Sequence, residues 1–196
     1  MTDEKRPYKK KRRAELEEQT RLRITESAVE LHGTVGPSRT SMSAIAEHAG
    51  VRRSTLYRHF PDEAAVFVAC SAHWSASNPA PDPGAWAAIA DPDERLATAL
   101  GELYVHYRAT QQMMANLHGD EALVPTVKQT FAAFHQYLGA CKEVLMGGRA
   151  LRGKAKRRVR AAIAHALAFR TWQSLGEDLD DAEAADLMCR LVREAG

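Results

Sequence analysis

The chain has 196 residues, of which 45% are hydrophobic and 27% are charged, and its formal net charge is only +2. This length is enough for a well-buried core in one domain together with a smaller one. The longest apolar run, AAVFVAC at residues 64–70, is far below the roughly 20 residues that a membrane-spanning helix needs. The charged N-terminus is unlike a signal sequence, so we expect a cytoplasmic protein with no membrane partner.

Positive charge is concentrated at the start of the chain. Residues 1–13 hold seven basic and two acidic residues, a charge of +5, whereas residues 61–196 hold 14 basic and 17 acidic residues, a charge of −3. A segment so rich in charge cannot bury enough apolar surface to fold alone, so we expect a disordered basic arm over residues 1–13. Such an arm is attracted to DNA phosphates through counterion release; the alternative is a solvated tail without a function.

Three helices are expected after the arm. The first spans about residues 14–35, because apolar side chains recur there at helical spacing before a Gly-Pro pair ends it. The second, shorter helix begins at Thr40 or Ser41, whose hydroxyl can cap it, and ends at Gly50. The third covers about residues 52–60.

The third helix has two different sides. At about 3.6 residues per turn, Leu56 and Phe60 lie on one side, while Ser54, Thr55 and Arg58 lie opposite. Two helices joined by a short glycine turn, with a basic outer face on the second helix, form the helix-turn-helix arrangement. Because an arginine fork can bind guanine or phosphate in the major groove, the pattern favours DNA binding. The alternative is an ordinary amphipathic helix.

The rest of the chain is also predicted to be helical, because alternating runs of β-branched residues are almost absent. A fourth helix reaches about Ser77, and the proline-rich stretch 78–86 connects it to a second region. Further helices are expected at about residues 91–119, 125–145, 154–174 and 181–194. We therefore predict an all-α fold, with a helix-turn-helix domain at residues 14–61, a connecting helix at 62–78 and a larger helical domain at 79–196.

The stretch TSMSAIAEHAGVRRSTLYRHFPDEAAVF, residues 40–67, resembles the signature of the tetracycline-repressor (TetR) family of bacterial transcription regulators. The shared features are a threonine-rich cap, an Ile-Ala pair, Ala-Gly-Val, Thr-Leu-Tyr-x-His-Phe and Pro-x-x-x-Ala, in this order and spacing. The resemblance covers about residues 20–70. It implies DNA-facing positions at Thr40, Ser41, Ser43, Arg53, Ser54, Thr55, Tyr57, Arg58 and His59.

The resemblance also implies partners and an activity. It implies a homodimeric repressor that binds a palindromic operator in double-stranded DNA and is released by an unidentified small-molecule effector. The DNA-binding head would then be followed by a larger ligand-binding and dimerisation domain. No cofactor and no metal are expected.

Three positions depart from the family pattern. Arg52 stands where a helix-capping serine is typical, so the start of the third helix should be weakened by about 1 kcal/mol; its guanidinium can instead reach DNA, and we include it among the DNA-binding residues. Glu63 replaces a phosphate-binding lysine, which leaves a small-molecule binding or adaptor protein with a degenerate DNA head as an alternative. His32 stands where an aromatic core residue is usual, and we interpret it as a core or rim histidine rather than a pH sensor.

The larger domain has no family-wide motif, and the resemblance there is limited to helix order and the segment FRTWQSL at residues 169–175. An effector cavity would lie between the middle helices, although aromatic and methionine stripes are also typical of plain core. The candidate ligand-binding residues are Tyr104, Tyr107, Met113, Met114, Phe131, Phe134, His135 and Tyr137.

The last two predicted helices carry alanine-rich stripes that allow another helix to approach closely. In the TetR family these helices pair across a two-fold axis, which gives candidate dimer contacts; the alternative is that the stripes close the core of a single chain. The candidate dimer residues are Ala162, Ile163, Ala166, Leu167, Arg170, Ala184, Leu187, Met188 and Leu191.

Other kinds of chemistry are not indicated. Cys70, Cys141 and Cys189 are far apart and lack a Cys-x-x-Cys or His-x-x-x-His partner, so we expect reduced thiols and neither a disulfide framework nor a zinc site. The histidines are scattered, and the chain contains no His-Glu-x-x-His, Gly-x-Ser-x-Gly or glycine-rich phosphate motif. The sequence therefore does not predict an enzyme.

Overall fold

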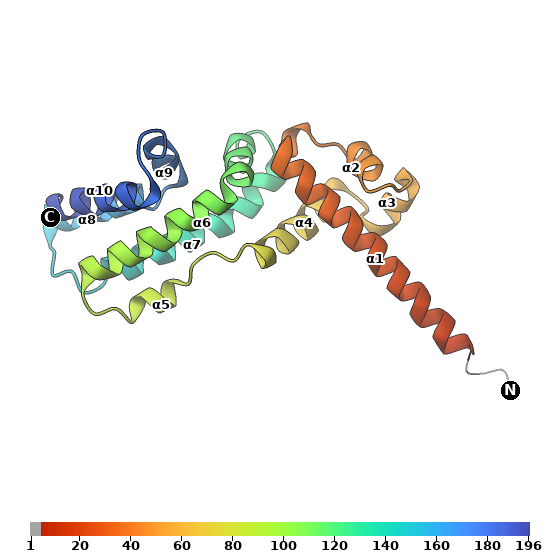
Figure 1. The fold of residues 1–196 in the computed structure, drawn as a ribbon, viewed down its shortest axis with the longest axis horizontal. Helices are drawn as coiled ribbons and strands as arrows, with labels where there is room; N and C mark the ends of the chain where they lie inside the picture. Colours follow the sequence, from red (N-terminus) through yellow and green to blue (C-terminus); the bar gives the residue numbers. More distant parts are fainter. Residues whose placement is uncertain (1–4) are drawn as a thin grey trace. The chain divides into compact units, whose positions relative to one another are not determined.

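The computed structural model describes the backbone of residues 5–196 and the side chains of Tyr8 and residues 10–196. Within this range the secondary structure is helical and contains no strand, which confirms the all-α prediction (Figure 1). None of the described helices is both long and apolar enough to cross a membrane. The chain divides into two compact units: residues up to Asn78 with Ala115–Thr130, and Pro79–Met114 with Phe131–Gly196.

The first unit is built on helix α1 (Lys5–Thr34), which a 3-10 turn (Pro37–Arg39) joins to the next helices. These are α2 (Met42–His48), α3 (Arg53–His59) and α4 (Glu63–Ser77). Their inward side chains form one apolar core, and apolar contact between helices is what holds such short helices in place. Fully buried members of this core include Ile24, Ala28, Ile45, Leu56 and Phe60.

Residues 115–130 also belong to this unit, although the sequence led us to place them in the larger domain. They contain the end of α6 (Pro92–Asp120) and the start of α7 (Pro125–Met146). Val127 is completely buried in the core of the first unit, and Leu117 and Val124 pack against it. A long helix that serves two cores has no break in its apolar pattern, so nothing in the sequence marks the division.

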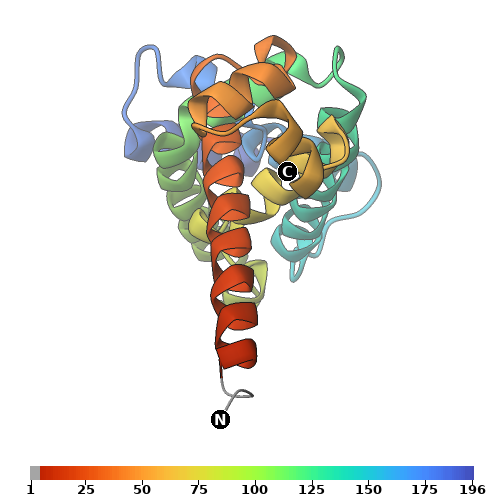
Figure 2. The same ribbon diagram turned by 90° about the vertical axis from the view of Figure 1, so that its right-hand side faces the viewer.

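Helix α1 is longer at its start than expected. Residues 5–13, which we expected to be a disordered arm, continue the helix, and the N-terminal part of α1 extends beyond α2 and α3 (Figures 1 and 2). The side chains of residues 10–19 are exposed. Lysine, arginine and glutamate are good helix formers, and lengthening a helix already held by packing needs no new nucleus. Residues 1–4 of the expected arm lie outside the described residues.

The second unit contains most of α6 and α7 together with α5 (Pro83–Ala87), α8 (Gly153–Ala166), α9 (Phe169–Leu175) and α10 (Asp181–Glu194). The helix expected at residues 154–174 is therefore two helices, with a break at residues 167–168. The hydroxyls of Tyr104 and Tyr107 donate to the carbonyls of Ala166 and Leu167 at 2.9 and 2.7 Å. These hydroxyls take the place of the amide donors that a continuous helix would supply.

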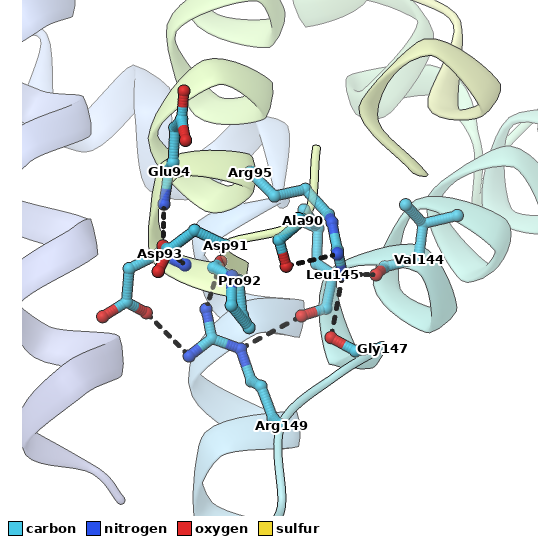
Figure 3. A network of polar contacts seen from close by, with 10 residues as sticks. All are labelled: Ala90, Asp91, Pro92, Asp93, Glu94, Arg95, Val144, Leu145, Gly147 and Arg149. Carbon is cyan, nitrogen blue, oxygen red and sulfur yellow. Dashed lines mark hydrogen bonds and ion pairs between the residues drawn. The ribbon is translucent and has the colours of Figure 1, made fainter. Parts of the chain in front are cut away.

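Two largely buried arginines hold the start of α6 against the end of α7 (Figure 3). Arg95 is 7% exposed, and its guanidinium makes five hydrogen bonds to backbone carbonyls of the loop before α6 and of the end of α7. The last carbonyls of a helix have no partner within it, so a guanidinium placed there satisfies them. Arg149 donates in the same way to the carbonyls of Pro92 and Leu145, and it forms an ion pair with Asp93 at 2.8 Å.

Replacing Tyr107 by phenylalanine tests the break between α8 and α9. The ring remains, but the buried carbonyl of Leu167 loses its donor, so we expect the free energy of unfolding in urea to fall by about 1–3 kcal/mol. Tyr8→Phe is the matched control, because Tyr8 is 67% exposed, and its effect should stay within about 0.5 kcal/mol. Equal stability of Tyr107→Phe and the wild-type chain would show that the hydroxyl does not hold the break.

Candidate nucleic-acid interface

Helices α2 and α3 form a helix-turn-helix pair. The turn between them contains Gly50 with φ of 63°, a backbone conformation that glycine adopts without strain. The amide of Val51 donates to the carbonyl of Ala46 at 2.9 Å, which closes the turn back onto α2. Leu56 and Phe60 are completely buried beneath α3, as the helical spacing in the sequence predicts, so the opposite side of α3 faces outward.

The outward side of α3 is basic and polar. Arg53, Ser54, Tyr57 and Arg58 are exposed there and form what we call the α3 outer face. Tyr57 is 42% exposed, and the Arg53 guanidinium lies 5.8 Å from the centre of its ring, an arrangement in which the cation is attracted to the ring face. Thr55 is only half-buried and lies at the edge of this face.

His59 lies at the side of α3 that meets α1 and is not part of the outer face. Its side chain is half-buried, and its ring Nε2 is buried without a hydrogen-bond partner among the described residues. Burial and the nearby cations Arg58 and Arg21 lower its pKa. Arg21 of α1 also donates to the His59 carbonyl at 2.8 Å and lies 4.2 Å from the centre of the Phe60 ring. No pattern in the sequence indicates that Arg21 secures the end of α3.

The residues at the start of α2 have different surroundings. Thr40 is buried at 7% exposure and its hydroxyl donates to the Gly36 carbonyl at 2.8 Å, so its side chain is turned away from the surface, contrary to our sequence-based assignment. Ser41 is the N-cap of α2, and its Oγ accepts from the Ala44 amide at 3.2 Å. Ser43 is exposed. Two of these three hydroxyls therefore have structural partners.

The structure also places Arg52 and Glu63, two of the three residues that depart from the family pattern. Arg52 occupies the N-cap position of α3, makes no side-chain capping bond and is exposed. Glu63 is exposed in the first turn of α4, where Asp62 caps the helix by accepting from the Ala65 amide at 2.8 Å. A carboxylate in the first turn is favourable beside the positive end of the helix, which is a sufficient structural reason for Glu63.

The end of α6 fixes the turn that leads from α1 into α2. Asn116 Nδ2 donates to the carbonyls of His32 and Gly33 at 2.9 and 2.8 Å, and so caps the carboxyl end of α1. Asp120 accepts from the Ser38 amide at 2.8 Å. Gly36 has φ of 93°, a backbone conformation that favours glycine, and a Cβ there would lie 3.0 Å from Asp120 Oδ2, a tight contact that would displace the carboxylate.

His32 is buried in the same region at 6% exposure, which supports its interpretation as a core histidine. Its ring centre lies 5.4 Å from that of Phe67, and its Nδ1 lies 3.4 Å from the Cys70 Sγ. Burial lowers the pKa of His32 from 6.5 to about 4, and the nearby Asp120 carboxylate opposes this only in part. The imidazole is therefore neutral at pH 7.

The candidate ligand-binding residues are mostly part of the packed core. Tyr104 and Tyr107 are completely buried and their hydroxyls bond to the backbone of the α8–α9 break. Tyr137 is half-buried and donates to the Pro81 carbonyl at 2.9 Å. The remaining candidates are Met114 and Phe131, which are buried, Met113 and Phe134, which are half-buried, and His135, which is exposed.

Five of the candidate dimer residues are likewise buried within a single chain, so they close its own core. These are Ile163, Ala166, Leu167, Ala184 and Met188. The stripe periodicity could not separate the two possibilities, because a core contact and a dimer contact have the same spacing. Ala162 and Leu187 are half-buried, and Arg170 and Leu191 are exposed, so these four retain surface for a second copy.

No group of three or more potential metal ligands occurs among the described residues.

The buried core beneath α2 and α3 and the basic α3 outer face give the N-terminal unit the arrangement of a helix-turn-helix DNA-binding domain. Residues 24–70 match the family model of bacterial regulatory proteins of the tetR family, which confirms the TetR resemblance of the sequence. No curated protein sequence matches the chain.

Solved structures show that the resemblance in fold extends over most of the chain. NalD, the secondary repressor of the MexAB-OprM multidrug efflux pump in Pseudomonas aeruginosa, is 20% identical with a TM-score of 0.60, over 92% of this chain and 97% of NalD. A TetR-like transcriptional regulator from Rhodococcus sp. RHA1 is 19% identical with a TM-score of 0.61, over 89% of this chain and 94% of its own. PfmR, a TetR-family regulator from Thermus thermophilus, is 19% identical with a TM-score of 0.58, over 86% of this chain and 96% of PfmR. The chain therefore has the fold of the TetR-family transcriptional regulators.

The neutral, buried His32 predicts an acid-sensitive stability. Between pH 6.5 and 4 the unfolded chain binds a proton at this residue and the folded chain does not, so the free energy of unfolding falls as the pH falls through this range, by about 3 kcal/mol. His32→Phe keeps an aromatic ring and removes the titration. Urea unfolding of both chains at pH 7 and pH 4 measures the difference, and parallel losses in the two chains would contradict the assignment.

Proposed function

We propose that the protein is a ligand-responsive transcriptional repressor whose dimer binds a palindromic operator and is released by a small molecule. The observation that carries the DNA-binding part of this proposal is the α3 outer face, which presents guanidinium, hydroxyl and phenol groups from a helix of the width that the major groove admits. NalD, which has this fold, is described as a repressor, and this supports repression as the proposed outcome of DNA binding.

The proposed DNA contacts fall into two groups. Arg53, Tyr57 and Arg58 project from the open side of α3, and we assign Arg58 to base edges or phosphate and Tyr57 to phosphate oxygens. Arg52, Ser54 and Thr55 lie beside them, and Ser41 and Ser43 lie at the start of α2. Thr40 is buried and bonded to the Gly36 carbonyl, and His59 is half-buried on the side of α3 near Arg21. We therefore propose no direct DNA contact for these two residues.

The alternative function is a small-molecule binding or adaptor protein that keeps a degenerate DNA head. The observations that favour it are the uncapped start of α3 at Arg52 and the acidic Glu63. Footprinting on genomic DNA separates the two functions, because an adaptor protein with a degenerate DNA head would protect no specific operator sequence.

Alanine at both Tyr57 and Arg58 tests the recognition helix. Footprinting of the protein on its own genomic DNA supplies the operator, and the affinity of the double variant for it should fall at least tenfold, because each direct contact is worth about 1–3 kcal/mol. The dependence of affinity on salt concentration should also become weaker. Arg157→Ala, an exposed arginine of α8, is the control for lost positive charge. Unchanged operator affinity of the double variant would contradict the assignment.

The proposed dimer uses the exposed sides of α8 and α10. Leu191 is a large apolar side chain with 50% exposure on α10, and the half-buried Leu187 precedes it by one helical turn. Apolar side chains in such positions gain stability when a second copy covers them. A two-fold dimer would also provide two recognition helices for the two halves of a palindrome.

Sedimentation analysis at micromolar concentration tests this dimer. The wild-type chain should have about twice the monomer mass of 21.6 kDa, and Leu191→Glu should lower the mass to that of a monomer, because a carboxylate would be buried without a partner. Val105→Glu is the matched control, since Val105 is 62% exposed on α6, and it should leave the dimer intact. A wild-type mass near that of the monomer would refute the dimer.

A further inference from the structure

The start of α1 continues past the helix-turn-helix pair as a helix. Arg21 of α1 meets the carboxyl end of α3, where its guanidinium donates to the His59 carbonyl at 2.8 Å. On the N-terminal side of Arg21 the helix runs without a break to Lys5. At about 1.5 Å per residue, Lys10 lies roughly 16 Å along the helix axis from Arg21, and this part of α1 reaches beyond α3 in Figure 1. We call residues 5–19 the α1 extension.

The α1 extension is not part of the apolar core. The side chains of residues 10–19 are all exposed, so no other part of the described chain covers them. Ile24 is the first buried side chain of α1 among the described residues, and it lies beyond the extension. The extension therefore presents its surface to a partner or to solvent, and its charges decide which partner it fits.

The positive charge of the extension is concentrated far from α3. Four consecutive cations, which we call the basic turn, are Lys10, Lys11, Arg12 and Arg13.

These cations are largely unpaired. Among the described residues only Arg13 of the basic turn has an ion pair, with Glu17 at 3.0 Å, and both side chains are exposed, so the pair contributes little. Glu15, Glu17 and Glu18 stand between the basic turn and the part of α1 that packs beneath α3. The basic turn is therefore a second positive surface, separated from the α3 outer face by an acidic turn.

The arrangement of the basic turn fits a polyanion better than a membrane surface. Consecutive residues of a helix differ by about 100°, so its four cations point to all sides of α1. Leu16 is the one large apolar residue at positions 10–19, so this segment lacks the apolar face of a helix that lies in a membrane interface. Duplex DNA carries one phosphate charge per about 1.7 Å of its axis, and the α3 outer face of the same unit is basic as well.

We propose that the α1 extension is a second DNA-contacting element, whose basic turn binds phosphates outside the groove that α3 enters. This inference rests on the proposed DNA-binding function. The extension adds affinity without sequence preference, because phosphate contacts carry no base information. Each phosphate that it neutralises makes the slope of log affinity against log salt concentration steeper by about 0.9.

Replacing all four cations of the basic turn by glutamine tests this contact. Glutamine is a good helix former, so the variant keeps the helix and loses only charge. At about 0.1 M salt its affinity should fall at least tenfold, and the salt slope should decrease by about two or more. Both changes should occur with the operator duplex obtained by footprinting and with a random-sequence duplex of equal length. The variant should still prefer the operator, because the α3 outer face is intact.

Helix α8 offers a matched control with the same loss of charge. Its four exposed cations, replaced together by glutamine, should leave both affinities within about twofold; they are Lys154, Lys156, Arg157 and Arg158. Wild-type affinity of the basic-turn variant for both duplexes, or an equal loss in the α8 variant, would overturn the proposal. Tighter binding of the wild-type chain to phosphatidylserine vesicles than to the random duplex would also overturn it. A wild-type chain that prefers no duplex would instead contradict the proposed repressor function.

A tethered cleavage reagent locates the extension on the DNA. Ala14 follows the basic turn and is exposed, so Ala14→Cys can carry an iron–EDTA label. The label attaches selectively, because the three native cysteines are buried. It should cut the operator duplex in one short stretch of backbone outside the bases that α3 protects, because it is carried by a continuous helix. Ala164→Cys on the exposed side of α8 is the matched control and should not cut. No cleavage from position 14 in a saturated complex would refute the proposal.

Discussion

The position of the helix-turn-helix depends on the turn between α1 and α2, and this turn is fixed by two side chains from the end of α6. Asn116 satisfies the last carbonyls of α1, and Asp120 binds the amide of Ser38 just beyond Gly36. Carbonyls at a helix end have no partner within the helix, so an amide donor held in place there determines where the helix stops. The positive φ of Gly36 and its close approach to Asp120 then leave one path for the chain into α2.

Helix α3 is positioned by packing on one side and by the guanidinium of Arg21 at its carboxyl end. Leu56 and Phe60 are completely buried, and this fixes which side of a helix only two turns long faces the core. Arg21 reaches from α1 to the His59 carbonyl and lies over Phe60, so the carboxyl end of α3 is held where its own hydrogen bonds run out. The start of α3 at Arg52 has no side-chain cap, so Arg21 supplies the side-chain hydrogen bond at the opposite end of this helix.

In the second unit, hydrogen bonds to otherwise unpaired backbone carbonyls occupy several of the side chains that could have bound a ligand. The hydroxyls of Tyr104 and Tyr107 complete the broken helix at residues 167–168, and Arg95 satisfies carbonyls at the end of α7. Aromatic residues that look like the wall of a binding pocket are therefore used to stabilise the chain itself. Open space remains between alanines and a glycine of α6 and α10, where the sequence is least distinctive.

The all-α fold, the helix-turn-helix and the division of α3 into packing and outward sides all follow from the amino-acid sequence. These features depend on periodicity and turn residues, which are local: Gly50 ends α2, and Leu56 and Phe60 repeat at helical spacing. The helical start of α1 at residues 5–13 does not follow from the sequence, because composition alone does not show that a charged segment continues a helix already held by packing.

Tertiary packing decides which residues that are distant in the sequence form hydrogen bonds with each other. Arg21 with His59, Asn116 and Asp120 with the α1–α2 turn, and Tyr107 with Leu167 are each separated by at least 38 positions in the chain. Thr40 and the five buried dimer candidates show the converse, since a spacing that allows a surface position also allows the burial within the chain that they have. A hydrogen bond between distant residues leaves no periodic trace in the sequence, because its geometry is set by the packing of whole helices.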